Sequence, residues 1–313
     1  MSCMPDHISS LHDCTLCPRR CHANRVAGPL GHCRSGAGFG IGSICVHRGE
    51  EPALGEVCNI FFTHCNLQCV YCQNWQISRN AGPAVEHVMD ISEALRRVRA
   101  ALRAGARAVG FVSPSHCIPQ MNALMEALGA DKPKPTFVMN TNGYDAVETI
   151  RSLDGRMDVY LPDLKYMDAD LAERLSGARD YPEAAAVALI EMRRQKGLRL
   201  ELDETGCARS GLIIRHLVLP GHVENSLRCL RFIAEEIGPA VHLSLLAQYR
   251  PVPAVAHDAN LGRPLRQEEY AAVLDEAERL GFTHGWTQSL ESMDNYTPDF
   301  ALRHPFESRG EIE

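Results

Sequence analysis

The chain has 313 residues, of which 45% are hydrophobic and 23% are charged, and its formal net charge is −7. This length suits one α/β barrel with additions or two modest domains, and the composition is that of a folded protein rather than a disordered one. The acidic balance provides no general basic surface, so we expect no nucleic-acid partner. No apolar run is long enough to cross a bilayer, and the first residues do not resemble a signal peptide. We therefore expect a cytoplasmic enzyme without a membrane partner.

The N-terminal part of the chain is rich in cysteine, of which the whole sequence has 13. An odd number of cysteines in short spacings fits metal ligation better than a disulfide framework. Residues 3–56 show little hydrophobic periodicity, so we expect loops that a metal holds together. Four thiols there could close a tetrahedral site: Cys14, Cys17, Cys21 and Cys33. Zinc, an auxiliary iron–sulfur cluster and unliganded thiols all remain open for this second site.

After residue 56, apolar runs of strand length alternate with helix-periodic stretches, which is typical of βα units around a parallel sheet. The predicted strands are 57–63, 108–113, 136–141, 158–164, 212–219, 241–247 and a short last strand, 283–288, with 198–202 forming a hairpin onto the fifth. The predicted helices are 90–104, 119–128, 145–153, 169–175, 183–195, 224–237 and 266–280. We therefore predict an α/β fold with a partial (β/α)6 barrel at 57–298. A cysteine-rich, metal-stapled extension (1–56) precedes it, and a loose tail (299–313) follows.

Directly after the first predicted strand, Cys65, Cys69 and Cys72 form a CxxxCxxC motif. Three thiolates can hold a four-iron cluster and leave one iron open, whereas clusters that only relay electrons usually have four cysteine ligands. A vacant coordination position is also what separates catalytic from structural zinc sites. The motif therefore predicts a reactive iron–sulfur centre, with zinc as the competing occupant. The reverse assignment, with the N-terminal thiols as the reactive set, lacks a preceding strand.

Polar residues follow the next predicted strands at the points where these strands end. They are Ser113 to His116, Asn140 to Gly143, Asp163 to Lys165, and Arg215 on the fifth strand. In a barrel of βα units, the carboxyl ends of the strands meet at one rim, which carries the active site. We therefore expect these groups and the three cysteines to surround one bound cofactor.

These residues resemble a known family. The CxxxCxxC motif after the first strand, with Tyr71 just before its last cysteine, resembles the motif of the radical S-adenosylmethionine (SAM) superfamily, whose fold is a partial barrel. More narrowly, four segments look like the activating enzymes of pyruvate formate-lyase: Cys65 to Asn74, Thr141 to Gly143, Asp163 to Lys165 and Ile214 to Gly221. The extension from Cys14 to Cys33 is similar to an uncharacterised branch related to those enzymes.

The resemblance implies a cofactor pair, a 4Fe-4S cluster and SAM. The amine and carboxylate of SAM chelate the open iron, and an electron from the reduced cluster splits the C–S bond to give methionine and a 5′-deoxyadenosyl radical, which removes a hydrogen atom from the substrate. It also implies a protein or peptide substrate, such as a glycyl radical enzyme, and a flavodoxin- or ferredoxin-like electron donor. The alternative left open is a non-catalytic iron–sulfur or zinc protein that relays electrons or senses iron or oxygen.

Matched position by position, the resemblance also assigns roles. Cys65, Cys69 and Cys72 hold the radical cluster. Tyr71 and Asn74 lie near the adenine, and Lys165 meets the SAM carboxylate. The remaining cofactor-binding candidates are Ser113, Asn140, Asn142, Asp163 and Arg215, with Asp163 and Asn140 near SAM and an accompanying cation. The sequence assigns no catalytic residue.

One segment departs from the family pattern. The activating enzymes carry Gly-Gly-Glu after the second strand to bind the SAM amine, whereas this chain has Pro114, Ser115 and His116 there. The Ser115 hydroxyl, backbone carbonyls and a neutral His116 can all accept a hydrogen bond from an ammonium group. We therefore include Ser115 and His116 among the SAM-binding candidates.

Overall fold

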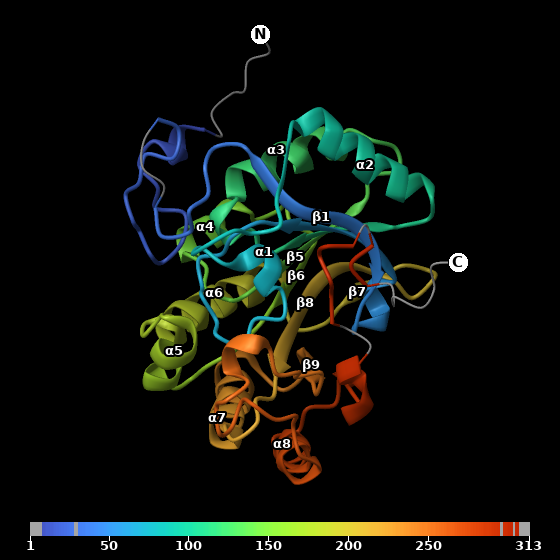
Figure 1. The fold of residues 1–313 in the computed structure, drawn as a ribbon. Helices are drawn as coiled ribbons and strands as arrows, with labels where there is room; N and C mark the ends of the chain where they lie inside the picture. Colours follow the sequence, from blue (N-terminus) through green and yellow to red (C-terminus); the bar gives the residue numbers. More distant parts are fainter. Residues whose placement is uncertain (1–7, 28–30, 295–296, 303, 307–313) are drawn as a thin grey trace, which may run out of the picture.

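In a computed structural model of the chain, residues 8–27, 31–294, 297–302 and 304–306 are described. Within them, ten strands form one sheet in the order β10-β9-β8-β6-β5-β4-β2-β1-β3, with β7 paired to β8. The strands are β1 Phe39–Arg48, β2 Glu56–Phe62, β3 His87–Met89, β4 Ala108–Val112, β5 Thr136–Thr141, β6 Val159–Pro162, β7 Glu201–Leu202, β8 Ala208–Leu217, β9 His242–Leu246 and β10 Gly285–Thr287. From β2 to β10 the main path is parallel, while β1 runs antiparallel to β2 and β3. The sheet curves without closing, as a partial barrel (Figure 1).

The helices of the described residues are α1 Trp75–Ser78, α2 Ile91–Arg103, α3 Ile118–Gly129, α4 Val147–Ser152, α5 Ala169–Ser176, α6 Tyr181–Lys196, α7 Val223–Phe232 and α8 Gln267–Arg279. α2 and α3 lie at one edge of the sheet and α7 and α8 at the opposite edge (Figure 1). The strands between these helices are apolar on both faces. In β4, for example, every residue is buried. α2 begins where the Asp90 side chain accepts a hydrogen bond of 2.8 Å from the Glu93 amide, so the predicted N-cap is confirmed.

The predicted order of strands and helices is confirmed, and β5 matches its predicted bounds at both ends. Two strands were missed: β1, because residues up to 56 were expected to be loops, and the short β3, which pairs with β1. β1 carries Gly40 and Gly42, which interrupt its apolar pattern. Its stability comes from pairing with β2, in which Ile41 lies opposite Phe62, and such tertiary pairing overrides local propensity. A Cβ on Gly42 would meet the Ile77 side chain at 2.6 Å, so glycine is required for α1 to pack there.

The start of the expected C-terminal tail is docked on the barrel rather than loose. Phe300 is only 2% exposed and packs edge-on against Phe61 of β2, with ring centroids 5.2 Å apart. Asp299 accepts a hydrogen bond of 2.9 Å from Gln76 of α1. Apolar burial and this hydrogen bond together fix the segment. Residues 307–313 lie outside the described part of the chain.

The N-terminal loops lie beside α3 and α4 (Figure 1). Their main anchor is Arg25, which is 3% exposed and donates hydrogen bonds to the carbonyls of Ser35 (2.8 Å), Gly36 (2.9 Å) and His116 (2.6 Å). One buried guanidinium thus joins two parts of the extension to the loop after β4. The division into an extension, a barrel and a tail remains a prediction.

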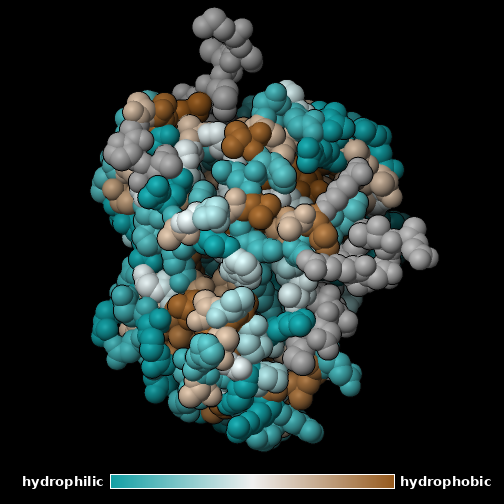
Figure 2. Space-filling view, in the orientation of Figure 1, coloured by the Kyte–Doolittle hydropathy of each residue, from teal (hydrophilic) through white to brown (hydrophobic). Residues whose placement is uncertain are grey.

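On the face seen in Figure 2, hydrophobic residues show as small separate patches among hydrophilic ones. Such scattered apolar surface is ordinary for a folded protein. Among the described residues, no helix combines the length and the apolar character that crossing a bilayer would require.

Candidate functional site

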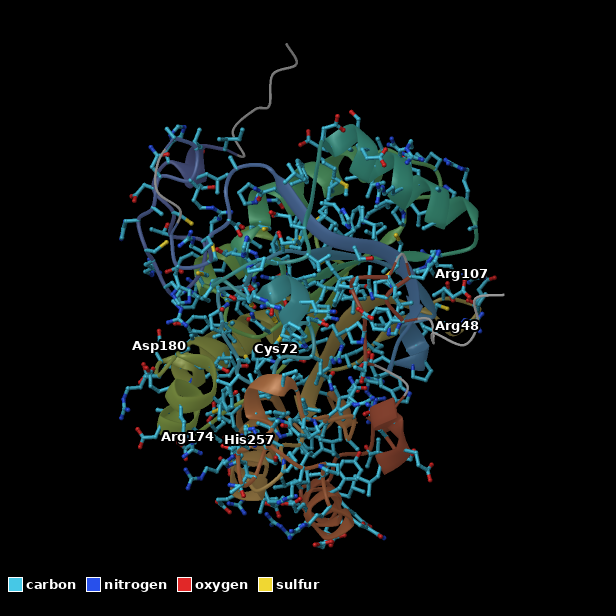
Figure 3. All side chains as sticks on the ribbon, in the orientation of Figure 1. Arg48, Cys72, Arg107, Arg174, Asp180 and His257 are labelled. Carbon is cyan, nitrogen blue, oxygen red and sulfur yellow. The ribbon has the colours of Figure 1, made fainter. Side chains whose placement is uncertain are left out.

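A cavity of about 190 Å³ opens at the carboxyl ends of β2, β4, β5 and β6. Its lining includes most of the residues expected at the rim: Cys65, Tyr71, Cys69, Cys72, Asn74, Ser113, Asn140, Asn142, Asp163, Lys165 and Arg215. Figure 3 shows Cys72 near the middle of the molecule, far from peripheral side chains such as Arg107. The fold therefore brings together residues that are more than a hundred positions apart in the sequence, while their roles remain predictions.

Cys65 lies in the loop that leaves β2, and its side chain is held from two directions. Its Sγ accepts hydrogen bonds from the Leu67 amide (3.4 Å) and from Nδ2 of Asn142 (3.3 Å), which comes from the loop after β5. The same Asn142 amide group donates to Oδ1 of Asn66 at 2.8 Å. The loops that follow β2 and β5 thus fix the position of this thiol.

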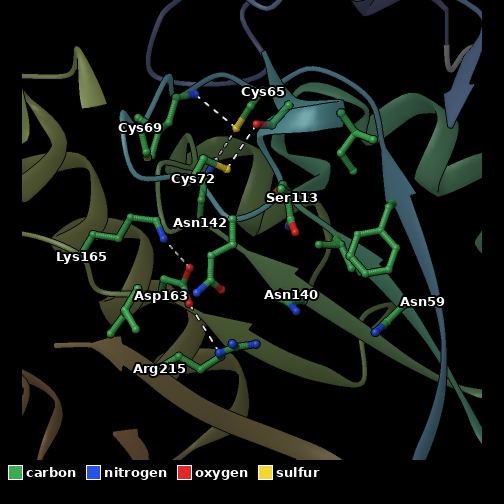
Figure 4. Close-up of a pocket in the computed structure, with 18 of the residues that line it drawn as sticks. Asn59, Cys65, Cys69, Cys72, Ser113, Asn140, Asn142, Asp163, Lys165 and Arg215 are labelled. Carbon is green, nitrogen blue, oxygen red and sulfur yellow. Dashed lines mark hydrogen bonds and ion pairs between the residues drawn. The ribbon is translucent and has the colours of Figure 1, made fainter. Parts of the chain in front are cut away.

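The other two thiols face the same cavity (Figure 4). Ser176, at the end of α5, donates a hydrogen bond of 2.9 Å to the Sγ of Cys69. The Sγ of Cys72 lies 3.2 Å from the hydroxyl of Ser78. A turn in which the Cys72 amide donates to the Cys69 carbonyl at 3.1 Å sets the spacing of the two cysteines. Backbone and side-chain hydrogen bonds therefore fix the shape of the CxxxCxxC segment in the metal-free chain.

The thiols of Cys65 and Cys69 are neutral at ordinary pH in the metal-free chain. Burial raises the pKa of Cys65 to about 12. Burial also raises the pKa of Cys69 to about 11, although the nearby Lys165 opposes this shift. Metal binding must therefore displace protons from these sulfurs, and iron is able to do so because thiolates are its ligands.

The chemistry of the arrangement fits a multi-iron cluster. Among the described residues, no group of three or more His, Cys, Asp or Glu side chains is arranged to hold a single metal ion. The cysteine ligands of a four-iron cluster bind different irons, so they surround a space instead of converging on a point. Three thiols around one cavity, with a lysine beside them to offset negative charge, have the required chemistry.

A charged wall faces the thiols across the cavity (Figure 4). Nζ of Lys165 lies 2.6 Å from the Asp163 carboxylate, whose other oxygen is 3.6 Å from Nε of Arg215. Burial lowers the pKa of Lys165, but Asp163 and Cys69 outweigh this effect, so its pKa is raised and the side chain stays cationic. A fixed positive charge next to the thiols can bind a carboxylate ligand.

Sequence reasoning missed two acidic residues of the site. Glu50 and Glu51 follow β1 and reach into the barrel, where each lies near Arg215, at 3.5 and 3.6 Å. Gln248 donates to Glu50 and Ser244 donates to Glu51, both at 2.8 Å. Burial raises the pKa of Glu51 to about 7, even though Arg215 lowers it. In the sequence this pair looks like an exposed turn, and only the path of β1 along β2 carries it inward.

Ser115 and His116 do not line the cavity. Ser115 is fully buried, and its hydroxyl lies 3.2 Å from the Thr141 hydroxyl. Nε2 of His116 lies 2.8 Å from the Thr63 carbonyl oxygen, and burial lowers the pKa of His116 to about 4. His116 is therefore neutral, but it is buried outside the lining of the cavity. Ser113, which has a positive φ of 49°, is the residue of this segment that faces the cavity.

The N-terminal thiols gather at a second place. Cys14, Cys17 and Cys33 are buried, and Cys21 is exposed with its Sγ beside Gly31. Burial raises the pKa of Cys17 to about 12, with Cys33 and Cys14 close enough to add to the shift. The four cysteines named from the sequence thus lie in one set of loops, while metal binding by them remains a prediction.

Comparisons with known proteins identify the family. A model described as the radical SAM superfamily matches residues 59–232, which include the three cysteines of the cavity. The protein named "Uncharacterized protein MJ0674", from Methanocaldococcus jannaschii, is 30% identical over 272 residues, covering 85% of this chain and 75% of the relative.

Two solved structures are also similar. The structure of HydG, a maturase of the FeFe-hydrogenase, has a TM-score of 0.51 at 14% identity over 72% of this chain. The matched part is 49% of HydG, so the chain spans about half of that protein, and the likeness concerns the fold. A domain of pyruvate-formate lyase-activating enzyme from Bacteroides vulgatus has a TM-score of 0.39 at 14% identity, covering 55% of this chain and 93% of that domain. With a family match over more than half of its length, the chain belongs to the radical SAM superfamily.

Proposed function

We propose that this protein cleaves SAM reductively at a 4Fe-4S cluster held by Cys65, Cys69 and Cys72, and uses the resulting radical to remove a hydrogen atom from a protein or peptide. The observation that carries the proposal is the set of three thiols lining one cavity at the barrel rim, within the segment that matches the superfamily. Three thiolates leave one iron of such a cluster free for a ligand.

The chain's own residues have distinct tasks in this proposal. When bound, the cluster supplies the electron that splits the C–S bond of SAM. Lys165 offers a cation to the SAM carboxylate, and Asp163 keeps that cation in place through its 2.6 Å contact. Asn142 holds the Cys65 sulfur in position. Apolar lining residues such as Phe62 keep water from a reactive radical.

The narrower form of the proposal is activation of a glycyl radical enzyme. It is supported by the segments from Cys65 to Asn74, Thr141 to Gly143, Asp163 to Lys165 and Ile214 to Gly221, which look like those of pyruvate formate-lyase activating enzymes. A protein electron donor of the flavodoxin or ferredoxin type would supply the low-potential electron.

A product assay tests the broad form. The protein is loaded with iron and sulfide without oxygen, reduced and mixed with SAM, and 5′-deoxyadenosine is quantified. We expect formation in the intact protein and in Cys207→Ala, whose cysteine lies before β8 at the opposite end of the sheet. A cluster-loaded protein that makes no 5′-deoxyadenosine would overturn the proposal.

The narrow form has its own assay. A purified glycyl radical enzyme is added to the same mixture, and the organic radical is sought by electron paramagnetic resonance (EPR). A SAM-dependent radical on that enzyme supports activation. SAM cleavage without any such radical would refute activation of a glycyl radical enzyme but would still support reductive cleavage of SAM.

A further inference from the structure

Asn66 connects the two sets of thiols. It is fully buried and follows Cys65 directly in the chain. The Sγ of Cys65 lies 3.7 Å from its Oδ1, which also accepts from Asn142. The same side chain is near enough to the Cys17 thiol, in the N-terminal set, to lower the pKa of that thiol. One amide group therefore lies beside a sulfur of each set.

A further contact anchors the N-terminal extension to Asn66. Nε of Arg19 donates a hydrogen bond of 3.1 Å to the Asn66 carbonyl, and the Arg19 guanidinium lies 5.2 Å from the ring centre of Tyr144. Tyr144 in turn accepts from Nδ2 of Asn66 at 2.7 Å through its carbonyl. The loops around Cys17 are thus docked against the cysteine loop of the barrel by several independent contacts.

The N-terminal thiols also have a built-in counter-charge. Arg25 is 3% exposed, and its Nη1 lies 3.7 Å from the Sγ of Cys14. The rest of its guanidinium is fixed by the backbone carbonyls of Ser35 and Gly36. A buried cation is costly unless a negative group accompanies it, and metal-bound thiolates are negative. The position of Arg25 therefore suits a thiolate-ligated metal centre.

We propose that Cys14, Cys17, Cys21 and Cys33 hold a second iron–sulfur cluster that passes electrons to the cluster at Cys65, Cys69 and Cys72 across Asn66. Four thiolates cap every iron, which is the usual ligation of a cluster that only relays electrons. This inference rests on the proposed function, because a relay needs an electron acceptor in the cavity.

The electron balance of the relay is simple. A reduced one-electron carrier protein gives one electron to the second cluster, and the same electron then reduces the first cluster, with no bond made or broken. Of the seven thiols in the two sets, Cys21 is the exposed one, while Cys69 and Cys72 are partly buried. A carrier protein can therefore contact the second set directly at Cys21. Zinc could not take part in such a relay, since it has no redox chemistry.

The decisive experiment isolates the second set. In the full-length triple variant Cys65→Ala/Cys69→Ala/Cys72→Ala, loaded without oxygen, we expect about four irons per chain and the EPR signal of a reduced cluster that SAM does not alter. The intact protein should hold about eight irons, and Cys17→Ser about four with a SAM-responsive signal. A triple variant that holds zinc, or no metal, overturns the second cluster.

A kinetic readout separates relay from mere structural support. With reduced flavodoxin as donor, Cys17→Ser should form 5′-deoxyadenosine several-fold more slowly than the intact protein. With dithionite, a small reductant that reaches the first cluster directly, the two rates should be similar. Equal losses with both donors would refute the relay. Loss of SAM cleavage in the intact protein, with the triple variant still holding its cluster, would instead refute the proposed function.

Discussion

The two thiol sets of this chain lie in different kinds of structure. Cys65, Cys69 and Cys72 sit on a loop that follows β2, a strand paired on both sides, and hydrogen bonds from Asn142 and Ser176 already hold two of the sulfurs. The described N-terminal loops have little regular structure beyond a short 3-10 helix, Ser9–Leu11, and β1. The barrel therefore holds its thiols through its own hydrogen bonds, whereas we expect the extension to depend on Arg25 and on the proposed metal for its rigidity.

The largest effect should come from removing one thiol of the set in the barrel. In Cys69→Ala we expect SAM cleavage to fall to background, because two thiolates cannot retain the cluster in a reactive position. Iron analysis should show that about four irons per chain are lost. Cys207→Ala is the matched control and should keep both. An active Cys69→Ala would place the reactive centre elsewhere.

Lys165 offers a sharper test of how the site holds SAM. Replacing it with methionine removes the cation that we expect to face the SAM carboxylate, and leaves Asp163 with Arg215 as its cationic neighbour, at 3.6 Å. A charge-assisted hydrogen bond contributes roughly 1.5–3 kcal/mol, so the KM for SAM should rise roughly tenfold or more. Lys134→Met provides the control, since Lys134 forms a comparable pair with Asp158 at the exposed start of β5. Unchanged SAM binding in Lys165→Met would show that Lys165 does not bind the SAM carboxylate.

Metal removal should change the protease sensitivity of the extension and leave that of the barrel unchanged. After chelation, limited proteolysis is expected to cut within residues 8–38 roughly tenfold faster than before, which corresponds to about 1.4 kcal/mol of lost local stability. The barrel should keep its resistance, because its core does not depend on metal. Equal sensitivity of both regions, or protection of the extension after chelation, would contradict the comparison.

The smallest effect concerns Glu51. Its pKa in the folded chain is raised from 4.5 to about 7 by burial. The stability that the protonated side chain contributes is therefore complete below pH 4.5 and is lost as the pH rises through about 7. The side-chain amide introduced by Glu51→Gln cannot ionise. The melting temperature of the variant minus that of the parent should therefore rise between pH 5 and pH 8, by on the order of a few degrees. The exposed Glu183→Gln should show no such trend, and a constant difference for Glu51→Gln would refute the shift.

The sequence predicts the barrel well because its strands are continuous apolar runs and its helices have a clear period. The residues at strand ends are predictable for the same reason, since parallel strands bring Asn142, Asp163 and Lys165 to one rim. Asn59 was missed because it lies inside the apolar run of β2, although it lines the cavity.

Contacts between distant segments could not be read from local patterns. Glu50 reaches the cavity only because β1 folds back along β2, and Asn66 is notable only once Cys17 lies beside it. In the sequence, Asn66 separates two motif positions and resembles an ordinary loop residue. Long-range pairing of this kind has no periodic signal.

The most direct test of the account is the EPR spectrum of the reduced, iron-loaded protein before and after SAM is added. We predict that SAM changes the signal of the cluster at Cys65, Cys69 and Cys72, because one iron of that cluster has no protein ligand. The change should persist in Cys17→Ser. A cluster spectrum that is identical with and without SAM would contradict the open iron on which the account depends.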